Sequence, residues 1–134
     1  MSAKPILLLA FLITSPLMMN SPLMAQEAVS PSFISKDLAR VSSKEIQMYT
    51  VDFPPGYSIP VHRHNAQVFL YVLEGSIVTQ VKGGKEVTLT PGQSYYENPD
   101  DIHTVSRNAS GTKPAKFLVF MVKEKGAPST VLEK

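Results

Sequence analysis

Three histidines are the residues of this chain whose type and spacing could do chemistry. His62 and His64 stand two positions apart in a strand-like stretch, so their imidazoles point to the same side of the strand. His103, the only other histidine, follows a tight turn and opens a later strand, from which it could face the first pair. Imidazoles grouped in this way bind divalent transition metals. The alternative is that the first two lie on an exposed edge strand and the third ends a loop.

Composition narrows the chemistry further. The chain has no cysteine, which excludes disulfides, thiolate ligands and a cysteine nucleophile. The net charge is only +2, the basic residues are scattered and tryptophan is absent, so the composition excludes nucleic-acid binding. A length of 134 residues with 43% hydrophobic residues fits one globular domain.

The segments that must position the histidines have the pattern of short strands. Over residues 45–123, apolar runs are separated by glycine and proline turns such as Pro91-Gly92. This part contains no apolar run with helical periodicity. Phe69–Leu73 and Phe117–Val122 are apolar at nearly every position, which predicts strands covered on both faces. We therefore predict an all-β domain in which two sheets close on each other.

The spacing around the histidines resembles the two-part motif of the cupin family. Five residues separate Gly56 from His62-Arg63-His64, and Tyr71-Val72-Leu73-Glu74-Gly75 follows. Later, Pro91-Gly92 introduces Asn98-Pro99-Asp100-Asp101-Ile102-His103, and Arg107-Asn108 ends the second part. The resemblance covers residues 45–123 and implies a double-stranded β-helix, the jelly-roll or cupin barrel. It also implies that His62, His64 and His103 bind a divalent transition metal (Fe, Mn, Ni, Zn or Cu) inside the barrel.

The resemblance is incomplete at the fourth ligand. The glutamate of the family motif, four residues after the second histidine, corresponds here to Val68. Gln67 is adjacent and becomes a metal ligand if the preceding turn shifts the strand by one residue. Glu97, six residues before His103, is the carboxylate that could bind the metal or act as a base; otherwise it is a solvated turn residue. Three imidazoles without a carboxylate would leave the ion its full 2+ charge and favour an anionic or chelating ligand.

Three protein ligands leave coordination positions open, as in catalytic metal sites. The first functional hypothesis is therefore a metal-dependent oxidoreductase, with dioxygenase chemistry on a small organic substrate as the leading class and Glu97 and Tyr71 as candidate catalytic residues. The alternatives are a non-catalytic module that binds a small ligand or the metal, and a barrel without metal. Of the neighbours Tyr95 and Tyr96, only one can point inward.

The ends of the chain carry separate predictions. Residues 1–25 have the pattern of a secretory signal peptide, with Lys4 before the apolar run 6–13 and a cleavage site at Leu23-Met24-Ala25. We expect a periplasmic or secreted protein with no membrane contact after cleavage. Residues 26–44 are expected to form an arm, residues 45–123 the barrel and residues 124–134 a tail. A homodimer is the expected assembly, with the last strand and the tail as an exchanged edge.

Overall fold

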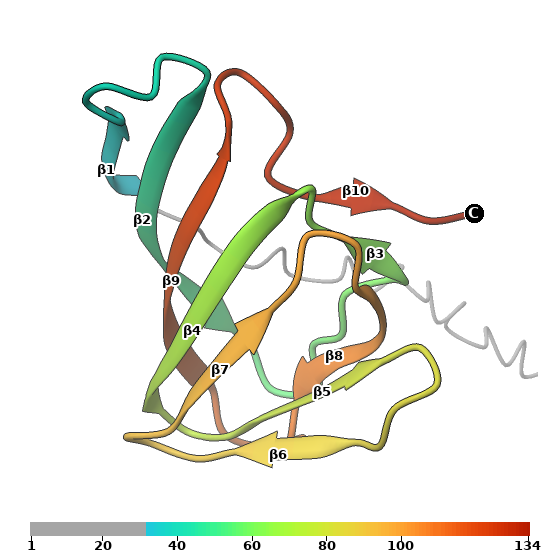
Figure 1. Ribbon diagram of the computed structural model, residues 1–134. Helices are drawn as coiled ribbons and strands as arrows, with labels where there is room; N and C mark the ends of the chain where they lie inside the picture. The colour runs from blue at the N-terminus through green and yellow to red at the C-terminus, as the bar shows by residue number, and fades with distance from the viewer. Residues whose placement is uncertain (1–31) are drawn as a thin grey trace, which may run out of the picture.

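The computed structural model describes residues 32–134 as two five-stranded antiparallel sheets that face each other (Figure 1). One sheet has the strand order β1-β2-β9-β4-β7 and the other β10-β3-β8-β5-β6. The strands are β1 (Ser32–Asp37), β2 (Lys44–Phe53), β3 (His62–Arg63), β4 (Ala66–Glu74), β5 (Ile77–Val81), β6 (Val87–Leu89), β7 (Ser94–Glu97), β8 (Ile102–Asn108), β9 (Ala115–Glu124) and β10 (Val131–Leu132). The predicted all-β double-stranded β-helix is confirmed. The predicted signal peptide lies outside the described residues.

Both ends of the described chain contribute strands to the barrel. β1 lies within the segment expected to be an arm and pairs with β2, with Ile34 opposite Met48. β10 lies within the expected tail and pairs with β3, with Leu132 opposite His62 (Figure 1). The tail therefore forms part of the second sheet. Within residues 32–134, no helix is long and apolar enough to cross a membrane.

The core lies between the sheets and is filled by alternate residues of the long strands. In β4 and β9 every second side chain is buried, because successive strand residues point to opposite faces. The buried apolar residues of these strands and of β2 include Val51, Phe53, Val68, Leu70, Val72, Phe117, Val119 and Met121. The edge-to-face contact of Phe53 with Phe117, with ring centroids 4.9 Å apart, joins β2 to β9 at one end of the core.

The other face of the same sheet is apolar but open. Phe69 and Tyr96 are 44% and 43% exposed, so the prediction that β4 is covered on both faces is wrong for the described chain. The strand registers align Ile34, Met48, Phe120, Phe69 and Tyr96 in one row across five strands. Periodicity in a run that is apolar throughout does not show which face is covered. The homodimer stays a prediction, and this row is an apolar surface on which it could form.

Asn108, the last residue of β8, joins three segments of the barrel by side-chain hydrogen bonds. Its side-chain amide donates to the carbonyl oxygens of Phe53, at 3.1 Å, and Lys113, at 2.8 Å, while its oxygen accepts from the Ser110 N–H at 2.9 Å. The Asn108 side chain is buried, so these bonds satisfy its own polar atoms, which water does not reach. One amide thus joins β8 to the end of β2 and to the loop before β9.

Gly75, in the turn between β4 and β5, is required by both conformation and space. Its φ is +67°, and an added Cβ would overlap the carbonyl oxygen of Pro114 and lie 2.9 Å from the Cβ of Ala115. We expect Gly75→Ala to lower the free energy of unfolding by about 3 kcal/mol or more, because left-handed backbone strain and steric overlap add. Gly83→Ala is the matched control, since Gly83 also has a positive φ, +81°, but nothing lies near its Cβ position. The control should lose only about 1 kcal/mol. Urea denaturation measures both, and equal losses would contradict the steric argument.

Candidate metal centre

The barrel brings the three histidines together at one end of the space between the sheets. His62 on β3 lies directly opposite His103 on β8, and their rings stack with centroids 5.2 Å apart. His64 follows β3, and its ring centroid lies 5.0 Å from that of His62 and 5.6 Å from that of His103. His62 and His103 are almost fully buried. The exposed edge strand and loop that formed the alternative are therefore not the arrangement in the structure.

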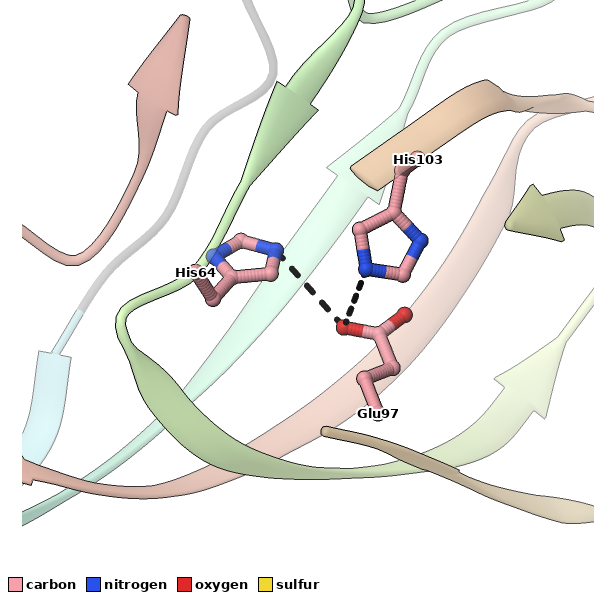
Figure 2. Close-up of side chains that lie close together, drawn as sticks. All are labelled: His64, Glu97 and His103. Carbon is pink, nitrogen blue, oxygen red and sulfur yellow. Dashed lines mark ion pairs between the residues drawn. The ribbon is translucent and has the colours of Figure 1, made fainter. Parts of the chain in front are cut away.

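Glu97, the last residue of β7, adds a carboxylate from the facing sheet. Its Oε2 lies 3.6 Å from Nε2 of His64 and 3.5 Å from Nε2 of His103 (Figure 2). The three ligand atoms of His64, Glu97 and His103 all lie within 4.8 Å of one another, which is the geometry of a group that could hold a metal ion. Glu97 is 4% exposed, so it is not a solvated turn residue.

Hydrogen bonds on the far side of the rings decide which nitrogens are available. Nδ1 of His62 lies 2.9 Å from the carbonyl oxygen of Pro60, and Nδ1 of His64 lies 2.6 Å from that of Ser129. A carbonyl oxygen only accepts, so both Nδ1 atoms carry the proton and both Nε2 atoms keep a free lone pair. Nδ1 of His103 lies 3.5 Å from the hydroxyl of Thr79. The rings are thus held with Nε2 as the nitrogen that can bind a metal.

Burial keeps the three histidines and Glu97, the metal group, uncharged when no cation is present. It lowers the pKa of His62 and His64, and it lowers that of His103 to about 4 with help from the two neighbouring histidines. Burial likewise raises the pKa of Glu97 to about 8, with a smaller contribution from Asp101. The contacts of Glu97 with the two imidazoles therefore join neutral groups near pH 7, and they are not salt bridges in the usual sense.

Two atoms of the group have no hydrogen-bond partner. Oε2 of Glu97 and Nε2 of His103 are both buried without one, although buried polar atoms are nearly always paired. A divalent cation bound between them would satisfy both atoms and would favour the ionised carboxylate. The chemistry of the donors and these two unpaired atoms both fit a transition metal.

The protein's C-terminal segment supports this centre. Buried Lys123 pairs with Glu45 and donates to the carbonyl oxygen of Ala127 at 2.6 Å, which turns the chain back toward β3. The hydroxyl of Ser129 then donates to the side-chain oxygen of Gln47 at 2.8 Å, and the carbonyl of Ser129 accepts from His64. The sequence gives no sign of this contribution, because every residue has a backbone carbonyl and nothing marks that of Ser129.

A cavity of about 230 Å³ lies beside the group, and His64 and Glu97 form part of its wall. Tyr49, on β2, also lines it. Burial raises the pKa of Tyr49 to about 12, and the nearby Glu97 adds to the effect. Tyr49 was not among the tyrosines singled out from the sequence, and its position on the inner face follows only from the register of β2 with β9.

A family model described as a cupin domain matches residues 49–121. The chain belongs to the cupin family. Among solved structures, DMSP lyase DddQ from Ruegeria pomeroyi DSS-3 matches with a TM-score of 0.63 and 22% identity, covering 78% of this chain and 51% of that one. A cupin-like protein from Thermotoga maritima MSB8 matches with a TM-score of 0.60 and 20% identity, covering 78% and 74%. An oxalate oxidase in complex with glycolate matches with a TM-score of 0.54 and 23% identity, covering 65% and 45%.

These identities show a shared fold, and this cupin spans about half the length of the DMSP lyase. No curated protein sequence matches the chain.

The barrel explains how this cupin can have Val68 where the motif has glutamate. Val68 on β4 lies directly opposite Glu97 on β7, so the two side chains share the inner face. Directly opposed residues have Cβ atoms about 4.5–5.5 Å apart. Glu97 therefore reaches the same region from the neighbouring strand. The full 2+ charge expected for a site without a carboxylate does not apply to this arrangement.

The other residues singled out from the sequence lie elsewhere. Gln67 is exposed on the outer face of β4, and Tyr71 is 45% exposed on the same face. The structure does not bring either residue to the histidines. Tyr95 points inward and packs against the core, whereas Tyr96 points outward, which answers the question that the sequence left open.

Exchanging the residues at positions 68 and 97 tests whether Glu97 takes the place of the motif glutamate. Glu97→Val should weaken the binding of Zn²⁺ or Mn²⁺ by about 100-fold or more, because the one carboxylate of the group is lost. The double variant Val68→Glu/Glu97→Val places a carboxylate at the opposing position and should recover affinity to within about tenfold of the original, measured by isothermal titration calorimetry.

The single variant Val68→Glu is the control for folding. It buries two carboxyl groups side by side and should lower the melting temperature, which the double variant should restore. Unchanged metal affinity in Glu97→Val would show that Glu97 is not a ligand.

Proposed function

We propose that this cupin is a metal-dependent enzyme that acts on a small organic substrate. The observation that carries the proposal is the pair of buried, unpaired atoms, Oε2 of Glu97 and Nε2 of His103, beside a cavity. A purely structural cluster has no need of a cavity at its side, whereas a catalytic metal keeps open positions toward one.

The ligands in this proposal are His62, His64, His103 and Glu97. His62 lies in ring contact with the other two histidines, although its nitrogens are not among the three closely grouped ligand atoms. Three imidazoles and one carboxylate suit Fe, Mn, Ni, Zn or Cu to different degrees. When bound, such an ion would polarise a substrate oxygen or, for iron, manganese or copper, support oxygen chemistry.

The side chains around the ion have assigned roles in the proposal. Glu97 lowers the net charge of the centre, and the Ser129 carbonyl holds the His64 ring in position. Tyr49 keeps its proton because its pKa is raised, so its hydroxyl can donate a hydrogen bond to a substrate oxygen in the cavity. Tyr71 has no part, since it lies on the outer face.

Oxidation of the substrate, including dioxygenase chemistry, is the reaction class that we place first. The oxalate oxidase and the DMSP lyase named above have two different activities, and both are too distant in sequence to transfer either one. The reaction class therefore rests on the mixed nitrogen and oxygen donors and on the open side toward the cavity.

The function is tested by loading metal-free protein with Fe²⁺, Mn²⁺, Ni²⁺, Zn²⁺ or Cu²⁺ and measuring oxygen uptake and product formation over a panel of small organic acids, alcohols and carbonyl compounds. One equivalent of metal should bind, and at least one loaded form should turn over a substrate. His103→Ala should abolish both, whereas Tyr71→Phe, on the outer face, should change neither.

Two outcomes would contradict the enzyme proposal. Thermal shifts with ligands but no turnover by any loaded form would identify a binding module. Failure of every metal to bind would leave a metal-free barrel.

We also propose that the protein is exported, on the strength of the apolar run 6–13 and the cleavage site ending at Ala25. Expression of the full chain in a Gram-negative bacterium should place a shortened protein that begins near Gln26 in the periplasm or medium. Mass spectrometry of the intact protein measures the new N-terminus, and Leu7→Arg/Leu8→Arg should keep the full-length chain in the cytoplasm. Full-length chain in the cytoplasm without those substitutions would overturn the proposal.

A further inference from the structure

The cavity beside the candidate metal centre has two unlike ends. His64, Glu97 and Thr79 line the end at the metal group, and Tyr49 adds a hydroxyl. Most of the remaining wall is apolar and includes the inward-facing residues Val51, Leu70, Ile77, Phe117 and Val119 of the two sheets, while Tyr57, Ser106 and Thr130 add hydroxyl groups. A molecule that fills the cavity therefore contacts the polar metal group at one end and mainly hydrocarbon along its body.

The wall offers nothing to neutralise a second negative charge. None of the residues that line the cavity is a lysine or an arginine, and its one acidic group, Glu97, belongs to the metal centre. A carboxylate away from the metal end would find no cation in this wall, and apart from the hydroxyls of Tyr57, Ser106 and Thr130 it would face mainly apolar side chains, which is unfavourable. The absence of a cationic side chain from the wall thus disfavours small dicarboxylates.

The cavity is partly open to solvent, and its size sets how much of an apolar body the wall can cover. A volume of about 230 Å³ equals that of roughly seven or eight molecules of liquid water. This space holds a compact molecule of roughly ten non-hydrogen atoms.

We propose that the substrate class of this cupin is a small amphipathic compound, with oxygen atoms that bind the metal at one end and an uncharged apolar body of four to six carbons at the other. The inference rests on the proposed function, because it takes the metal centre as the site of the polar end. It narrows that function from small organic substrates in general to those with one chelating head and one hydrocarbon tail.

Three hydroxamic acids that share one chelating head separate the contributions of head and tail. Acetohydroxamic acid has almost no tail, hexanohydroxamic acid has an apolar tail, and succinic monohydroxamic acid has a tail of similar size that ends in a carboxylate. Calorimetric titration of the Zn²⁺- or Ni²⁺-loaded protein should give at least tenfold tighter binding of hexanohydroxamic acid than of either other compound, because each buried methylene group favours binding.

A pair of adjacent substitutions tests whether the tail lies in this cavity. Val119 of β9 faces the cavity and Leu118, its neighbour, faces the outside of the sheet. Val119→Phe should fill the space and weaken hexanohydroxamic acid at least tenfold, while the affinities for the metal and for acetohydroxamic acid stay the same. Leu118→Phe should leave all three affinities unchanged. If Val119→Phe fails to fold, Val51→Leu fills part of the same space and should weaken the long compound alone.

The outcomes distinguish this inference from the function on which it rests. Metal binding with equal affinities for the three compounds, or with the charged tail preferred, overturns the substrate class and leaves the metal centre intact. Absence of metal binding overturns the proposed function, and the substrate class fails with it.

Discussion

The burial of the Glu97 carboxyl group against the imidazoles of His64 and His103 is the constraint on which the rest of this structure depends. Removing such groups from water is unfavourable unless they find partners, yet Oε2 of Glu97 and Nε2 of His103 have none among the described residues. His62 lies on the short strand β3, which pairs with β10 and β8, and His103 lies on β8, which pairs with β3 and β5. Glu97 ends the edge strand β7, which pairs with β4. This arrangement is expected of a preorganised cation site, because folding already includes the unfavourable free energy of burying the polar donors, and ion binding does not add it.

Positioning of the centre draws on parts of the chain that lie far apart. β3 holds His62 opposite His103, and β7 holds Glu97 opposite Val68. The C-terminal segment closes the arrangement, because the Ser129 carbonyl accepts from His64 and β10 completes the sheet beside β3 (Figure 1). Segments with no ligand of their own therefore determine which nitrogen of a ligand is available and how its ring is oriented.

The two faces of the β1-β2-β9-β4-β7 sheet differ in role, although both are apolar. The inner face contributes Val51 and Val119 to the cavity wall and Glu97 to the centre. The outer face exposes Phe69 and Tyr96, which contact each other with ring centroids 5.0 Å apart. An apolar surface of this kind on a monomer commonly marks a contact with another molecule. The proposed metal centre and the predicted homodimer surface thus lie on opposite sides of the same sheet.

Features of the fold that depend on only a few neighbouring residues could be predicted from the sequence. Glycine and proline turns and short apolar runs are read over a few residues, so the all-β fold and the cupin resemblance could be predicted, and the two-residue period placed His62 and His64 on one face. Only the tertiary structure identified Glu97 as the carboxylate that could serve as the fourth donor, because the register of β4 with β7 places it opposite Val68. The same holds for Tyr49 and the Ser129 carbonyl, which reach the site by pairing between distant strands. Gln67 was singled out because it is adjacent to Val68, and Tyr71 because it is a polar residue within a predicted strand. Strand parity turns both outward, since they have the opposite parity to the inward-facing Val68.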